Sequence, residues 1–206
     1  MLKIWGRNNS INVQKVMWAV AELGVAHERI DAGGAFGKVD QPEYAAMNPN
    51  RLVPVLEDGS AVIWESNAIV RYLAAQYGAG ELWPDDPAPR SEADRWMDWQ
   101  ITVIQADIRP VFWGLIRTPP EQRDMAEINA AAERLGTAMQ IFDRHLAGRT
   151  FVVGDTLTMG DIPIGCVCWR YLQLDIARPH LPHVTAYAER LQARPAYREH
   201  VMLPLT

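Results

Sequence analysis

Serine and glutamate residues stand at two places in the amino-terminal part of the chain where the pattern predicts the start of a helix. Ser10 lies in "GRNNSINVQKV" directly before a helical pattern, and Glu65 and Ser66 lie in "IWESNAIV" between a strand pattern and a helical one. The N-terminus of a helix presents unpaired amides and a partial positive charge, so it binds anions. A hydroxyl at such an end can donate a hydrogen bond to an anion such as a thiolate.

The second motif matches a different ligand. Glu65 would bind an ammonium group while the Ser66 hydroxyl and the helix amides receive a carboxylate, which together describes the zwitterionic head of an α-amino acid. Capping alone is the alternative for both motifs, because serine is a favoured N-cap residue and an acid there complements the helix dipole. The stretch "NNSINVQKV" offers no His or Asp base. We therefore do not expect Ser10 to act as a deprotonated nucleophile.

Pro54 interrupts an apolar strand pattern in "RLVPVLEDG". Proline has no amide hydrogen, so it belongs at a strand edge or in a special geometry such as a cis peptide bond. A strand-edge proline is the plain interpretation. Where a β-β-α unit follows a β-α-β unit, the residue before the proline, here Val53, can turn its backbone N–H and C=O outward to pair with a peptide-like ligand.

The positions of these candidate residues depend on the helices and strands around them. The apolar periodicity of residues 1–78 predicts a thioredoxin-like domain with a β-α-β unit and a β-β-α unit. The Asp-Gly pair of "EDGS" predicts a hairpin, and the Gly-rich and Pro-rich residues 31–50 predict a long loop holding one helical turn. The predicted strands are 2–5, 27–30, 53–56 and 61–64, and the predicted helices cover 13–23 and 66–78.

Residues 79–90 have no usable periodicity and are rich in proline, which predicts a linker. Only helical patterns follow, so residues 91–206 are predicted to form an all-helical domain. The fold class is therefore α/β followed by all-α. Pro110 should kink or end its helix, whereas Pro119 and Pro120 suit the opening of the next helix.

Composition excludes several classes of function. The net charge of −5, with dispersed Lys and Arg, argues against a nucleic-acid partner. No run of about 18 apolar residues and no secretory start is present, so we expect a cytoplasmic protein without a membrane partner. Cys166 and Cys168 are predicted to be buried helix residues, and no metal site is expected. Thr158 and Asp161 have the spacing of a capping box, which is a structural role.

The motifs and their order resemble the glutathione S-transferase family over essentially the whole chain, with the bacterial serine-type, theta-like and phi-like branches most similar. They are "SINVQKVMWAVAELG", "NPNRLVPVLEDG", "ESNAIVRYLA", the proline-rich linker and "LTMGDIPIG". The resemblance implies that glutathione is the co-substrate, and it places the activating hydroxyl on Ser10. Asn12 is a second candidate for the catalytic contact with sulfur, and Asn9 is a candidate glutathione contact.

The same resemblance assigns the remaining glutathione contacts. It places the cis-proline on Pro54, so the backbone of Val53 would bind the cysteinyl part, and it places Glu65 and Ser66 on the γ-glutamyl group. Arg51 would lie near the glycyl carboxylate. No cysteine lies near Ser10, which disfavours mixed-disulfide reductase chemistry.

The predicted function is conjugation of the glutathione thiolate to a small apolar electrophile, as in detoxification, by a homodimer. Phe112, Trp113 and Ile116 are candidates for the electrophile wall and Arg109 for an anion stabiliser, although aromatic residues at helical spacing more often belong to a core. A homodimer would place Asp94 or Asp98 near the partner's glutathione site. Two alternatives are open: a glutathione-binding carrier whose catalysis is vestigial, and a glutathione-dependent peroxidase or isomerase.

Overall fold

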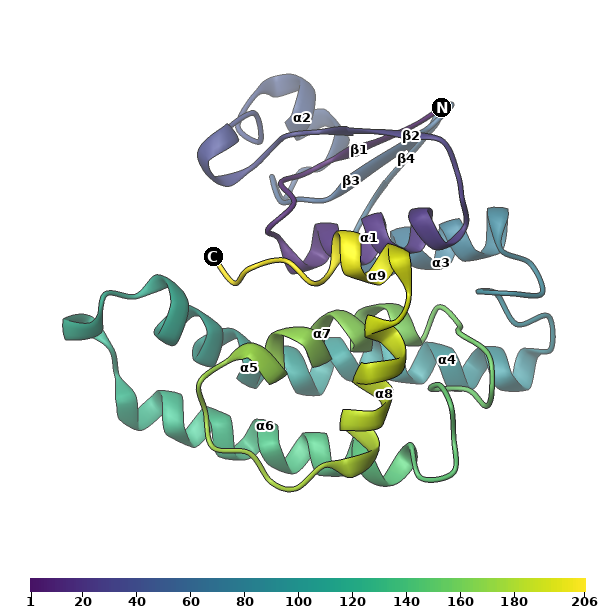
Figure 1. Ribbon diagram of the computed structural model, residues 1–206. Coiled ribbons are helices and arrows are strands. Elements are labelled where there is room, and N and C mark those ends of the chain that lie inside the picture. The colour runs from purple at the N-terminus through teal and green to yellow at the C-terminus, as the bar shows by residue number, and fades with distance from the viewer.

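The computed structural model describes residues 1–206, and its amino-terminal part has the predicted thioredoxin-like order. The elements are β1 (Leu2–Trp5), α1 (Ile11–Glu22), β2 (His27–Ile30), the short η1 (Gly34–Phe36), α2 (Pro42–Met47), β3 (Val55–Asp58), β4 (Ala61–Trp64) and α3 (Ser66–Tyr77). The sheet order is β2-β1-β3-β4, with β1 parallel to β2 and the other two pairs antiparallel. α1 and α3 lie on one side of the sheet and α2 on the other (Figure 1).

Alternating burial along β1 explains how the sheet is covered on two sides. Leu2 and Ile4 are buried in the main core, whereas Trp5 points to the opposite face. There the Trp5 ring meets the Tyr44 ring of α2 edge to face, with 6.1 Å between centroids. The sheet therefore holds α1 and α2 in fixed positions around the loops at the end of β1.

The predicted hairpin is present, but its first strand starts later than expected. Asp58 pairs with Ala61 across the turn, and Gly59 adopts the left-handed φ of 59° that this turn requires. β3 covers Val55–Asp58 instead of the predicted 53–56, because Pro54 has no amide hydrogen to give to the ladder. The Val53–Pro54 peptide bond is cis.

The rest of the chain is helical, as predicted (Figure 1). None of these helices combines the length and apolarity that a membrane crossing requires. They are α4 (Pro87–Trp99), the π-helical η2 (Gln100–Ile104), α5 (Gln105–Phe112), the π-helical η3 (Trp113–Arg117), the 3-10 turn η4 (Pro120–Gln122), α6 (Met125–His145), α7 (Asp161–Gln173), α8 (Pro182–Gln192) and α9 (Pro195–His200).

The prolines of this region act differently from the sequence prediction. α4 starts at Pro87, inside the predicted linker, with the Asp86 carboxylate accepting the Ala88 amide at 2.9 Å. Pro110, predicted to kink or end its helix, lies inside α5 and does not end it, since the chain continues directly into the π-helical η3. The prediction that Pro119 and Pro120 open the next long helix is wrong. They introduce only η4, and α6 begins after its own cap at Asp124.

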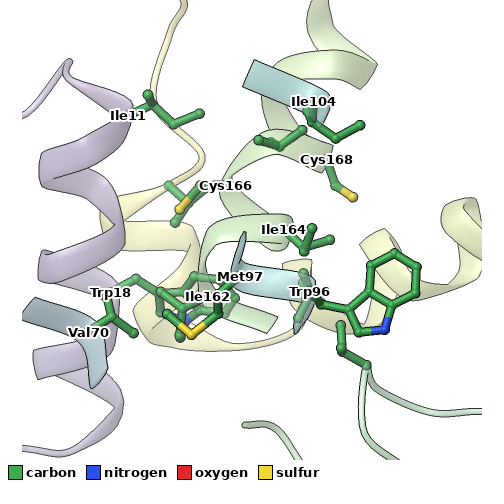
Figure 2. Packing of buried hydrophobic residues seen from close by; sticks show 14 of the residues in the cluster. Ile11, Trp18, Val70, Trp96, Met97, Ile104, Ile162, Ile164, Cys166 and Cys168 are labelled. Carbon is green, nitrogen blue, oxygen red and sulfur yellow. The ribbon is translucent and has the colours of Figure 1, made fainter. Parts of the chain in front are cut away.

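One continuous hydrophobic core joins the sheet side to the helical side through α1 and α7. Figure 2 shows Trp18 of α1 among core residues that include Ile162 of α7. Gly165 makes this close approach possible, since a Cβ atom there would lie 2.7 Å from the Trp18 ring. Cys166 and Cys168 are buried in α7 as predicted, and burial raises the pKa of the Cys166 thiol to about 12.

The predicted capping box at the start of α7 is only half present. The Asp161 carboxylate accepts the Thr158 amide at 2.8 Å, but the Thr158 hydroxyl donates to that carboxylate at 3.2 Å instead of capping the helix amide. The other Asp161 oxygen accepts the Val152 amide at 2.8 Å and the Tyr187 hydroxyl at 3.0 Å. Asp161 is fully buried, so it links three segments of the helical domain.

Candidate active site

A cavity of about 350 Å³ lies between the loops beside β1 and β3 and the helices α5 and α7. It brings together eight of the residues predicted from the sequence, whereas Pro54, Glu65 and Ser66 are not part of its lining. The lining residues are Arg7, Asn9, Ser10, Ile11, Asn12, Gly33, Gly34, Val39, Arg51, Leu52, Val53, Gln105, Ile108, Arg109, Phe112, Trp113, Arg117 and Arg170.

Ser10 stands at the N-cap position of α1, but its hydroxyl makes no capping hydrogen bond. Its backbone is extended, with φ −83° and ψ 122°, and its carbonyl accepts the amides of Val13 and Gln14, both at 2.9 Å. The capping alternative is therefore not realised. The hydroxyl and the amides of Ile11 and Asn12, which have no backbone partner, are available to an anion in the cavity.

The asparagines around Ser10 have separate partners. Asn12 accepts a hydrogen bond from the Ser66 hydroxyl at 3.3 Å, which connects the start of α3 to the cavity wall. The Asn9 amide group donates to the Thr206 hydroxyl at 2.8 Å. Its carbonyl oxygen is buried without a hydrogen-bond partner.

Val53 offers the unpaired backbone that the sequence predicted. Neither its N–H nor its C=O makes a hydrogen bond, although the carbonyl of Leu52 next to it accepts from the Tyr44 hydroxyl at 2.8 Å and from Asn48 at 2.9 Å. The two bonds to Leu52 fix the segment, while the free groups of Val53 remain for an extended ligand. Val53 itself lines the cavity.

Glu65 and Ser66 stand at the start of α3. Glu65 is exposed in the N-cap position without a side-chain cap, and its φ of 69° is unusual for a residue with a side chain. Such a conformation costs about 1–3 kcal/mol and persists most often at functional sites. Ser66 is buried and uses its hydroxyl on Asn12. Capping therefore does not explain either side chain.

Arg51 is exposed and has a left-handed φ of 54°. Its guanidinium lies 3.6 Å from the Asp40 carboxylate, and both side chains are largely exposed, so this pair contributes little to stability. Arg109 is also exposed, and it forms no ion pair. Both arginines can therefore turn to a ligand at small cost.

The aromatic wall is more charged than the sequence suggested. Phe112 is buried, whereas Trp113 is 48% exposed, and Ile116 does not reach the cavity. The Arg170 guanidinium lies 3.8 Å from the centroid of the Phe112 ring, and that of Arg117 lies 5.2 Å from it. The rings thus hold cations as well as forming an apolar surface.

Sequence reasoning missed Arg7, Arg117 and Arg170, which all line the cavity. The available signals were weak. Arg7 follows β1 in the loop before α1, and Arg170 is a single charge in the apolar run "IPIGCVCWRYLQL". A lone charge on an otherwise apolar helix often marks a partner or a site, so Arg170 was the more detectable.

Comparison with known proteins decides the family. The model "Glutathione S-transferase, N-terminal domain" matches residues 1–75, and "Glutathione S-transferase, C-terminal domain" matches residues 104–195. The chain belongs to the glutathione S-transferase family. It is 42% identical to Glutathione S-transferase GstB of Escherichia coli (strain K12), over 100% of both chains. It is 30% identical to Glutathione S-transferase 3 of Zea mays, over 97% of this chain and 93% of the relative.

A solved structure extends the match to three dimensions. The theta class glutathione S-transferase from Xanthomonas axonopodis pv. citri, determined with glutathione bound, has a TM-score of 0.96 and 48% identity, and the match covers 100% of this chain and 99% of that chain. The family and fold predicted from the sequence are confirmed. As a glutathione S-transferase, the protein transfers glutathione to electrophiles. No group of three or more His, Cys, Asp or Glu side chains is placed to hold a metal ion.

Proposed function

We propose that this transferase binds glutathione in the cavity with its sulfur at the N-terminus of α1. The observation that carries the proposal is a set of unused groups on one wall: the Ser10 hydroxyl and the N–H and C=O of Val53. The cysteinyl part would pair with Val53 as an added strand pairs with a sheet edge. The Xanthomonas relative, which is similar over the whole chain, was determined with glutathione bound.

The ends of the tripeptide fit the groups on either side. The γ-glutamyl carboxylate would meet the amides at the start of α3 and the Ser66 hydroxyl, which would have to turn from Asn12, and its ammonium would meet the exposed Glu65. The glycyl carboxylate would pair with Arg51 in place of the weak Asp40 contact. Pro54 is buried directly after Val53, and Asn9 would contact glutathione from the cavity lining.

The reaction requires the thiol to ionise near neutral pH. A free cysteine thiol has a pKa of about 8.5, and each unit of depression corresponds to about 1.4 kcal/mol of preferential binding of the anion. A hydrogen bond from the Ser10 hydroxyl, together with the field of α1, supplies stabilisation of that size. The proton leaves to solvent, the thiolate sulfur forms a bond to the electrophilic carbon, and the leaving group departs with the bonding electron pair.

The electrophile would lie against Phe112 and Trp113, which form the apolar side of the cavity opposite Ser10. We also propose the homodimer and the role in detoxification that the sequence predicts, and the cytoplasmic location remains a prediction. Asp94 and Asp98 both contact Arg71, at 2.7 Å and 2.5 Å. In a dimer these carboxylates would therefore have to leave Arg71 in order to approach a partner's glutathione.

The test is turnover of a chromogenic aryl chloride with glutathione by the wild type, by Ser10→Ala and by Ser60→Ala. Ser60 lies exposed in the β3–β4 turn, so its variant controls for the loss of a hydroxyl. We expect Ser10→Ala to lower kcat/KM by about tenfold to a hundredfold, because a charge-assisted hydrogen bond is lost, and Ser60→Ala to match the wild type. If the protein binds glutathione but turns over no electrophile, the result would instead favour a glutathione carrier. If it turns over only hydroperoxides, the result would favour a peroxidase.

A further inference from the structure

Positive charge is concentrated in the cavity although the chain as a whole carries a net charge of −5. The lining includes the five arginines Arg7, Arg51, Arg109, Arg117 and Arg170 and no aspartate or glutamate. Arg51 has an acidic neighbour outside the cavity. None of the other four pairs with an aspartate or glutamate side chain, although Arg117 donates to the main-chain oxygen of Thr206 at 3.1 Å. A cleft lined by one sign of charge attracts ligands of the opposite sign.

Three of these guanidiniums form a cluster that comes from distant parts of the chain. The cationic cluster consists of Arg7 from the loop after β1, Arg117 from η3 and Arg170 from α7. Gly33 and Gly34 make room for Arg7, since a Cβ on either would lie 3.2–3.3 Å from its side chain. Burial lowers the pKa of Arg170 to about 10, and repulsion from Arg117 and Arg7 acts in the same direction.

Arg170 is the member that folding alone does not explain. Its guanidinium packs over the Phe112 ring but makes no hydrogen bond and no ion pair. Arg170 is half-buried, so its guanidinium is partly desolvated, and the Phe112 ring offsets only part of that cost. Such a group is expected where a ligand supplies the missing anion.

Glutathione accounts for only part of this charge. In the proposed binding mode its glycyl carboxylate meets Arg51, and its γ-glutamyl carboxylate meets the start of α3. Only the thiolate then remains to face Arg109 and the cationic cluster, which line the same cavity. One thiolate does not balance these guanidiniums, so a second negative charge fits beside it.

We infer that the second substrate is a small electrophile that carries a carboxylate, bound by the cationic cluster with its apolar body on Phe112. This inference rests on the proposed function. In the reaction the sulfur of glutathione forms a bond to the substrate carbon, and a halide leaves with the bonding electron pair. The carboxylate is unchanged and remains on the thioether product, so the arginines select the substrate and take no part in bond exchange.

The experiment compares a chloronitrobenzoate with its primary amide, which has the same size but no charge. For each compound kcat/KM is divided by the uncatalysed rate constant with the glutathione thiolate, which removes the difference in intrinsic reactivity. We expect the wild type to prefer the carboxylate by about tenfold or more. In Arg170→Met the ratio of the two corrected values should fall to near one. We expect this because kcat/KM for the carboxylate falls, while kcat/KM for the amide changes by less than about threefold.

Two further variants keep the test decisive. Arg144→Met removes one exposed positive charge on α6 and should retain the preference. Arg7→Met should reduce it, which covers the case in which Arg170→Met does not fold. Equal corrected rates for the two compounds in the wild type would overturn the inference but leave the proposed function intact. Turnover of neither compound would overturn both.

Discussion

Lys15 is the most deeply buried cation of the protein, and replacing it tests the physical basis of the α1 packing. It is 2% exposed, and its ammonium group donates to the Gln100 side chain at 2.8 Å and to the Asn67 side chain at 3.4 Å. Both acceptors are neutral amides. The titratable groups that act on it are Glu65 at the start of α3, and Cys166 and Arg170 on α7.

Burial lowers the pKa of Lys15 from 10.5 to about 8. In the unfolded chain the side chain keeps its ordinary pKa, so between these two values the unfolded state binds the proton and the folded state does not. Stability then rises with pH across this window, and the cost of the buried charge is fully present below it. The shift of 2.5 units (10.5 minus 8) corresponds to roughly 3 kcal/mol.

The assay is denaturant unfolding of Lys15→Met and of Lys3→Met at several pH values. Lys3 is exposed on β1, so the two variants have the same net charge and differ in which lysine is lost. Removing Lys15 leaves the Asn67 and Gln100 carbonyls without their donor, a cost of about 1–3 kcal/mol each that does not depend on pH.

The readout is therefore how the difference in unfolding free energy between Lys3→Met and Lys15→Met changes with pH. The sign of that difference at a single pH is not used. From about pH 8 to about pH 10.5, Lys3→Met should gain roughly 3 kcal/mol relative to Lys15→Met. A difference that stays constant across this range would show that Lys15 is not desolvated as the structure indicates.

Two further predictions concern the helical domain. Asp161→Ala should lower the free energy of unfolding by roughly 3–5 kcal/mol, because the buried Val152 amide and the Tyr187 hydroxyl lose their acceptor. A loss below about 1 kcal/mol in denaturant unfolding would contradict the linking role of Asp161. Gly165→Ala should lower stability by about 1–3 kcal/mol, since the new methyl group would meet the Trp18 ring at 2.7 Å. Unchanged stability in denaturant unfolding would contradict the packing.

The fold could be predicted because local signals agreed with the tertiary structure. The Asp-Gly turn, the helical spacing after Ser10 and the loss of strand patterns beyond the linker all describe interactions between near neighbours. The error at Pro119 and Pro120 has the same origin. A proline pair is compatible with any helical start, and only the Asp124 cap shows where α6 begins.

The sequence predicted only those residues of the candidate site whose role follows from their own short segment of the chain. Ser10, Val53 and Glu65 lie beside helix or strand ends, whose chemistry the sequence displays. Arg170 and Arg117 reach the cavity from α7 and η3, and no local pattern shows that their guanidiniums meet at the Phe112 ring. The positive charge beside Phe112 therefore depends on the tertiary packing of α7 and η3, which the periodicity of the sequence does not show.

The most direct test of the account is the pKa of the glutathione thiol in the binary complex, followed by thiolate ultraviolet absorbance. With the wild type we expect the thiol to ionise about 1–2 pH units below its value in buffer, and with Ser10→Ala we expect most of that depression to be lost. A bound thiol that ionises as it does in buffer, or a depression that Ser10→Ala leaves intact, would contradict the claim that the Ser10 hydroxyl at the start of α1 stabilises the thiolate.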